Sequence, residues 1–127
     1  MARVLIVDDA IFMRRMLSDI VREAGHEVAG EAGDALEAIE KFEELRPDLV
    51  TMDIVMPRHG DMDGIGALKR ILEIDPEARV VMVSALGQQE VVLEAIKIGA
   101  KDFIVKPFLP ENVAKAIDRV AVGAQSK

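Results

Sequence analysis

The stretch Asp48-Leu49-Val50-Thr51-Met52-Asp53 is a short apolar run that ends in a carboxylate. Near the N-terminus, Val4-Leu5-Ile6-Val7 leads in the same way into Asp8-Asp9. Two later apolar runs end in Ser84 and in Lys106. Runs this short, rich in branched residues, are typical of strands buried on both faces of a parallel sheet. Because open α/β sheets carry their sites at the carboxyl ends of the strands, these polar residues mark a candidate site.

Amphipathic segments alternate with the apolar runs along the whole chain. The alternation predicts right-handed crossovers and an α/β fold with a parallel sheet covered by helices on both faces. The second strand has no telling polar residue at its end, which suits an edge strand. Residues 1–127 are expected to form one domain, a usual size for a single core. The strands are expected at residues 4–7, 27–30, 49–52, 79–83 and 103–105, and the helices at 12–24, 35–45, 64–74, 88–98 and 110–123.

Several residues predict where helices begin and end. In the first helix, Phe12, Met16, Ile20 and Ala24 follow helical spacing, and Gly25 can close it in the left-handed conformation. Asp34 is expected to cap the second helix with Glu37 in the capping-box position, and Pro47 prevents its extension. Gly99 is expected just after the fourth helix. The last helix should begin near Pro110 and end by Gly123, with residues 124–127 frayed.

Composition narrows the class of protein. The chain has no cysteine, which excludes disulfides and thiolate metal sites. A net charge of −7 with a pI near 4.8 argues against nucleic acid or an anionic membrane as the main partner. No apolar stretch approaches the ~20 residues that cross a bilayer, and the N-terminus lacks the pattern of a signal peptide. We expect a cytoplasmic protein without membrane insertion.

Asp8, Asp9 and Asp53 would repel one another if they came together at the sheet edge. They can all stay ionised when a cation lies between them, and oxygen-only ligands with water suit Mg²⁺. With the positive charge of Lys106, such a site is nearly neutral and could accept a phosphoryl group, to which Ser84 could donate a hydrogen bond. Asp53, single and central, is the candidate nucleophile.

Each of these residues also has a plain structural interpretation. Asp8 and Asp9 could cap the first helix, and Asp53 could cap a turn before Met56-Pro57. Ser84 could be an ordinary strand-end hydroxyl and Lys106 a surface charge. Their joint occurrence at strand ends of one parallel sheet favours a functional site.

Four segments carry a resemblance to a known family: Val4-Leu5-Ile6-Val7-Asp8-Asp9, Met52-Asp53-Ile54-Val55-Met56-Pro57, Val83-Ser84-Ala85 and the ten residues from Gly99 to Phe108. In this order they resemble the receiver domains of two-component response regulators, and most of all the single-domain chemotaxis regulators. The resemblance implies a doubly wound, flavodoxin-like sheet of five parallel strands in the order 2-1-3-4-5, with five helices.

The resemblance also implies roles for individual residues. Asp53 would become a 4-aspartylphosphate by transfer from a histidine kinase. Mg²⁺ would be bound by Asp9, Asp53 and the backbone carbonyl of Val55, with Asp8 acting through a water molecule. Lys106, in a cis peptide with Pro107, would contact the phosphoryl group. Two further residues would form the switch: Ser84 moves toward the phosphate, and Phe103, otherwise a plain core aromatic, fills the vacated space.

The implied function is a signalling switch for chemotaxis or motility in a two-component phosphorelay. It catalyses its own phosphotransfer and hydrolysis and is not a metabolic enzyme. A chemotaxis-type histidine kinase would supply the phosphoryl group. A motor-switch or adaptor protein would bind the face formed by the fourth helix, fifth strand and fifth helix, and the chain would be a monomer.

The alternatives are a phosphorelay intermediate that passes phosphate to a histidine phosphotransfer protein, a flavodoxin-like electron carrier, and a small Mg²⁺-dependent phosphohydrolase. The electron carrier lacks Trp or Tyr for flavin stacking, and the hydrolase lacks an evident general acid.

One feature of this chain departs from the family pattern, and another concerns the rate at which the aspartyl phosphate would hydrolyse. The four residues from Arg58 through His59 to Asp61 separate Pro57 from Met62-Asp63-Gly64, where the family usually has one residue. The longer loop is either a tolerated insertion or brings Arg58 or His59 over the site. Val55 and Leu86 flank the expected phosphate and are both apolar, so neither can position an attacking water. We therefore expect slow autodephosphorylation.

Overall fold

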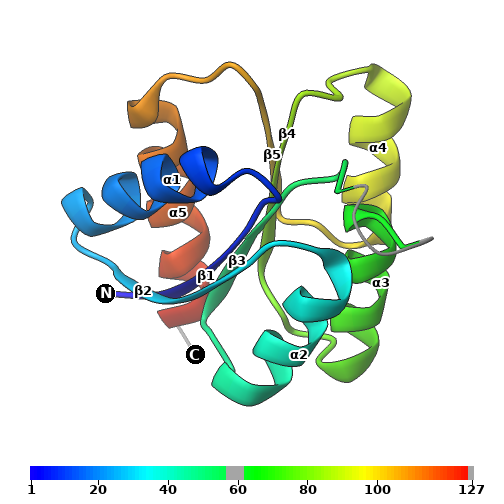
Figure 1. The fold of residues 1–127 in the computed structure, drawn as a ribbon, viewed down its shortest axis with the longest axis horizontal. Helices are drawn as coiled ribbons and strands as arrows, with labels where there is room; N and C mark the ends of the chain where they lie inside the picture. The colour runs from blue at the N-terminus through cyan, green and yellow to red at the C-terminus, as the bar shows by residue number, and fades with distance from the viewer. Residues whose placement is uncertain (57–61, 126–127) are drawn as a thin grey trace.

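The fold is a parallel sheet between two layers of helices, and a computed structural model describes it for residues 1–56 and 62–125 (Figure 1). Within these residues the sheet has five strands in the order β2-β1-β3-β4-β5, all parallel. The order and the edge position of β2 confirm the expected topology. The strands are β1 (Arg3–Val7), β2 (Glu27–Ala32), β3 (Leu49–Met52), β4 (Val80–Ser84) and β5 (Asp102–Val105).

Each face of the sheet is covered by its own helices, because successive strand residues point to opposite sides. Leu5 and Val7 of β1 face one apolar cluster, and Val4 and Ile6 face the other. The first cluster packs under α2 (Ala35–Leu45), α3 (Gly64–Ile74) and α4 (Gln89–Ile98). The second packs under α1 (Ile11–Glu23) and α5 (Pro110–Gln125). None of the helices in the described residues is long and apolar enough to cross a membrane.

The helix ends follow mostly from local chemistry. Asp34 caps α2 by accepting a hydrogen bond from the Glu37 N–H at 2.8 Å, as expected. Glu37 reaches back to the N–H of Gly33, one residue before the cap, at 2.7 Å. Gly25 and Gly99 follow α1 and α4 with φ of 91° and 138°, values that favour glycine.

Several expectations were wrong in detail. The bounds of β1, β2, β5, α1 and α4 differ from the predicted ones by one or two residues. The α5 helix continues past Gly123 to Gln125, because one helical glycine costs only about 1 kcal/mol relative to alanine. Phe12 is 71% exposed although Ile20 of the same apolar spacing is buried, since the face of α1 toward the sheet is centred on Leu17 and Val21. β4 runs one residue later than predicted, so Ser84 is its last residue.

Candidate functional site

The three predicted carboxylates meet at the carboxyl edge of the sheet. Asp8 and Asp9 follow β1, and Asp53 follows β3, the strand beside it. One carboxylate oxygen from each residue lies within 4.8 Å of the others. Asp8 and Asp53 are 1% and 6% exposed, whereas Asp9 is half-buried. A set of oxygen ligands this close together is suited to a hard divalent cation.

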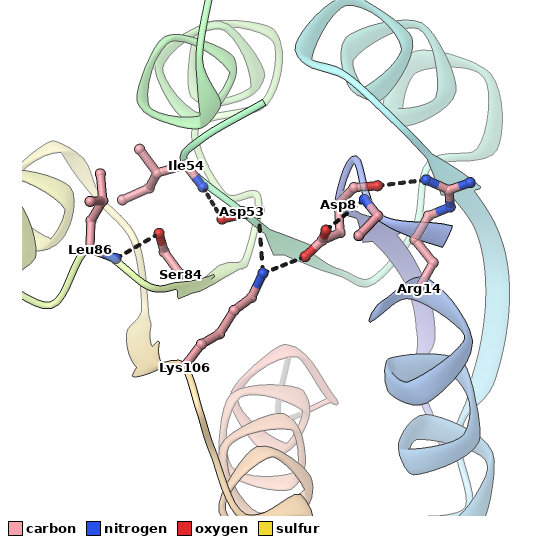
Figure 2. Close-up of polar contacts among 8 residues, drawn as sticks. Asp8, Arg14, Asp53, Ile54, Ser84, Leu86 and Lys106 are labelled. Atoms are coloured by element: carbon pink, nitrogen blue, oxygen red, sulfur yellow. Dashed lines mark hydrogen bonds and ion pairs between the residues drawn. The ribbon is translucent and has the colours of Figure 1, made fainter. Parts of the chain in front are cut away.

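Lys106 supplies a positive charge to this cluster (Figure 2). It follows β5, and its side chain extends between two of the aspartates, with Nζ 2.7 Å from Asp8 Oδ2 and 3.3 Å from Asp53 Oδ2. Burial works to lower the pKa of Lys106, but the hydrogen bond to Asp8 and the charges of Asp53 and Asp8 outweigh it. The pKa of Lys106 is therefore raised, and the lysine is fully charged at neutral pH.

The surroundings of Asp53 disfavour its charged form. Burial raises its pKa above the ordinary value, and the charge of Asp8 raises it further. The charge and hydrogen bond of Lys106 and a 2.8 Å hydrogen bond from the Ile54 N–H lower it without cancelling the effect of burial. One lysine thus does not neutralise the cluster, and a divalent cation among the three carboxylates would.

Ser84 and the cis peptide also lie where the sequence predicts. Ser84 is fully buried at the end of β4, and its Oγ accepts a hydrogen bond from the Leu86 N–H at 3.2 Å. Lys106-Pro107 is cis, as the resemblance implied. The ends of β1, β3, β4 and β5 therefore meet at one place, while the roles of their side chains stay predictions.

The remaining predicted residues surround the cluster. Val55 is 49% exposed on the loop after β3. Phe103 of β5 and Leu86 are partly buried against the apolar cluster under α2, α3 and α4. Arg58 and His59 lie outside the described residues.

Sequence reasoning missed two residues that support the site. Arg14 of α1 donates a 2.7 Å hydrogen bond to the backbone carbonyl of Asp8. Gly64, the first residue of α3, lies directly against the backbone of Asp53. Neither residue stands at a strand end, so the pattern that revealed the carboxylates could not reveal them. An arginine five positions after the paired aspartates was the available signal for Arg14.

The fold and the site together define a class of protein. A doubly wound sheet in this order, with three aspartates and a lysine at its carboxyl edge, is the arrangement of a receiver domain. The sequence model of the response regulator receiver domain matches residues 4–118, and the chain belongs to this family.

Relatives narrow the class to chemotaxis response regulators. The chain is 60% identical to the chemotaxis protein CheY of Thermotoga maritima over 119 residues, which cover 94% of this chain and 97% of the relative. It is 56% identical to the chemotaxis protein CheY of Bacillus subtilis over 117 residues, covering 92% and 95% of the two chains. The protein is thus a CheY-like receiver domain.

Solved structures agree with this assignment. The complex of CheX, CheY, BeF3 and Mg from Borrelia burgdorferi contains a chain that is 41% identical, with a TM-score of 0.88. The alignment covers 93% of this chain and 87% of that one. The response regulator domain of Thermotoga maritima CheB aligns with a TM-score of 0.83 and 42% identity, over 98% and 96% of the two chains.

Proposed function

We propose that the protein is a phosphorylation-activated switch that accepts a phosphoryl group on Asp53 from a chemotaxis-type histidine kinase. The observation that carries the proposal is the placement of Asp53. Its buried carboxylate lies in a cluster with Asp8 and Asp9, and it contacts Lys106 at 3.3 Å. Burial raises the pKa of the Asp53 carboxyl, so its charged form is poorly stabilised before the reaction. The ammonium group of Lys106 beside it can stabilise the negative charge of an incoming phosphoryl group.

The transfer would be a displacement at phosphorus. A carboxylate oxygen of Asp53 forms the new P–O bond while the P–N bond of the kinase phosphohistidine breaks, and its electron pair passes to the imidazole. Asp53 Oδ1 is held by the Ile54 N–H and Oδ2 by Lys106, which fixes the carboxylate plane before the reaction. Lys106 then remains beside the phosphoryl oxygens. Self-hydrolysis of the product would be slow because Val55 and Leu86 are apolar.

The donor set fits Mg²⁺, which Asp9, Asp53 and the backbone carbonyl of Val55 would bind directly and Asp8 through water. When bound, the ion offsets negative charge on the carboxylates and on the phosphoryl oxygens. Asp8 already accepts bonds from Lys106 and from the Ala10 N–H, at 2.7 and 2.9 Å, which agrees with an indirect role.

The signal would leave through the face formed by α4, β5 and α5. Ser84 would turn toward the phosphoryl group, releasing the Leu86 N–H, and Phe103 would move into the vacated space. A groove of about 610 Å³ on this face is lined in part by Phe103, Val105 and Leu109, and the last two are exposed. Polar residues, among them Asn112, Lys115 and Arg119, also line the groove. An exposed groove with both apolar and polar lining suits a protein partner, here a motor-switch or adaptor protein, with the receiver acting as a cytoplasmic monomer.

The proposal is tested by incubating the protein with Mg²⁺ and acetyl phosphate and measuring phosphoryl uptake by intact-protein mass spectrometry. Wild type should gain one phosphoryl group, and Asp53→Asn should gain none. Asp19→Asn, an exposed carboxylate change on α1, is the matched control and should behave as wild type. Uptake by Asp53→Asn would place the modification elsewhere and contradict the proposal.

A second step tests the output. Beryllofluoride with Mg²⁺ should raise the affinity of the protein for its motor-switch or adaptor partner, and Leu109→Ser should weaken that binding without changing phosphoryl uptake. An affinity that does not respond to beryllofluoride would contradict the proposed switch.

A further inference from the structure

Arg14 connects the aspartate cluster at the end of β1 to the edge strand β2. The residue lies in the first turns of α1, and its side chain is only 17% exposed. Nη1 donates to the carbonyl oxygen of Asp8 at 2.7 Å (Figure 2). Nε donates to Glu31 of β2 at 3.0 Å. The guanidinium therefore joins two neighbouring strand ends.

The carbonyl that Arg14 contacts belongs to the same peptide group as the N–H of Asp9. Fixing this peptide restricts one side of the Asp9 Cα, and the Ala10 N–H, which donates to Asp8 Oδ1, restricts the peptide on the other side. Together the two contacts limit the direction in which the Asp9 side chain leaves the backbone. Within the described residues, the Asp9 carboxylate has no hydrogen-bonding or ionic partner of its own. The carboxylate of Asp8, in contrast, is held at both oxygens, by Ala10 and Lys106. Among the residues that the structure describes, the backbone is therefore what orients the Asp9 carboxylate.

Arg14 is itself held in place. Glu31 accepts from Arg14 through one oxygen and from the Ser18 hydroxyl, at 3.5 Å, through the other. Gly33 leaves room for the guanidinium, because a Cβ there would lie 3.3 Å from Nη1. An arginine fixed at two donors positions its acceptors more firmly than a lysine can.

We propose that Arg14 is a positioning residue for the cation, which acts by orienting the Asp8–Asp9 peptide and through it the Asp9 carboxylate. The inference rests on the proposed metal site. For Arg14→Ala, this role predicts a change in cation affinity opposite in sign to the change that charge alone predicts. Removing a positive charge near three carboxylates should strengthen cation binding, whereas releasing the peptide should weaken it.

Binding of Mn²⁺, measured by the loss of the free-ion electron paramagnetic resonance signal and by competition with Mg²⁺, tests the inference. Arg14→Ala should raise the Kd for Mn²⁺ about 10-fold or more, the usual effect of losing a residue that orients metal ligands. Arg15→Ala is the matched control, because it removes the same charge from the next residue of α1, which is exposed. Its Kd should stay the same or fall.

A conservative pair separates positioning from a general loss of structure. Arg14→Lys keeps the charge but replaces the two donor nitrogens Nε and Nη1 by a single ammonium nitrogen, so its Kd should lie between those of wild type and Arg14→Ala. Arg15→Lys should match wild type. If Arg14→Ala does not fold by circular dichroism, the two lysine variants alone provide the contrast. Equal Mn²⁺ affinities at positions 14 and 15 would overturn the inference. Failure of wild type to bind Mn²⁺ would instead refute the proposed metal site.

Discussion

Gly64 lies against the backbone of Asp53, and a single methyl group there should disturb both fold and site. A Cβ on Gly64 would lie 1.9 Å from the Asp53 carbonyl oxygen and 2.7 Å from the Ile54 Cα. Real Cβ atoms essentially never approach other heavy atoms within 3.0 Å, so the first contact is about 1.1 Å too short. Because the contacted atoms are backbone, no change of rotamer relieves the clash. Either α3 must move away or the end of β3 must bend.

The cost can be estimated from these contacts. Forcing an extra carbon into a packed region costs about 1–3 kcal/mol, and more when only backbone can yield. Displacement also weakens the 2.8 Å hydrogen bond from the Gly64 N–H to the Ile54 carbonyl, worth about 0.5–1.5 kcal/mol. Alanine recovers up to about 1 kcal/mol through its helix propensity. We expect Gly64→Ala to lower the free energy of unfolding by about 1–3 kcal/mol.

Urea denaturation followed by far-UV circular dichroism measures this loss, since the chain has no Trp or Tyr for fluorescence. Gly66→Ala is the matched control in the same turn of α3. A Cβ on Gly66 meets the Met62 Cγ at 2.7 Å, a side-chain atom that a change of rotamer can move, so this variant should lose less stability than Gly64→Ala. Phosphoryl uptake should slow in Gly64→Ala alone. Indistinguishable urea midpoints for the two variants would refute the reasoning.

Three further predictions concern the charge of Asp53, the lifetime of the phosphorylated protein and the stability of the fold. Burial raises the pKa of Asp53, so the metal-free native state binds protons more readily than the unfolded state, and its stability falls as pH rises through that pKa. Asp53→Asn in chelator should therefore raise the urea midpoint at neutral pH, with a gain that shrinks on acidification; a midpoint below wild type would contradict this. The double variant Val55→Asn with Leu86→Glu should dephosphorylate about 10-fold faster or more, measured by phosphate release, and an unchanged rate would show that these side chains do not limit hydrolysis. His26→Ala should lower the free energy of unfolding by about 1–3 kcal/mol, because the buried N–H of Ala2 loses its acceptor Nδ1 at 2.9 Å. Asp118→Ala, which removes only an exposed partner of the same imidazole, should cost less.

Periodicity and strand-end chemistry predicted the order of the elements and the meeting of the carboxylates. The bounds of α3 were predicted to the residue because Asp63-Gly64 and Asp75-Pro76 bracket it. A strand buried on both faces is a short continuous apolar run, which can be recognised in the sequence without knowing the neighbouring strands. A parallel sheet places the carboxyl ends of such strands along one edge, and the strand order that the family resemblance implies brings Asp53 and Lys106 close together on it.

What the sequence did not reveal depends on contacts between distant segments. Arg14 has a partner in Glu31 only because β1 pairs with β2 in the register that places Ile6 beside Glu31. The exposure of Phe12 depends on which face of α1 packs on the sheet, which the spacing of apolar residues along one helix does not define. The closeness of Gly64 to Asp53 depends on where α3 begins in space. Each of these would need the tertiary structure to predict.

The sequence separation between Asp8 and Lys106 has a consequence for synthesis. These residues are 98 positions apart, while all three aspartates lie within the first 53 residues. On the ribosome the carboxylates are therefore made long before the ammonium group that contacts them. A nascent chain with β1 and β3 but without β5 carries the three carboxylates of the site without Lys106, so a divalent cation at the proposed metal site should help this half to become compact. The last strand then delivers the lysine, and completion of the site coincides with completion of the sheet.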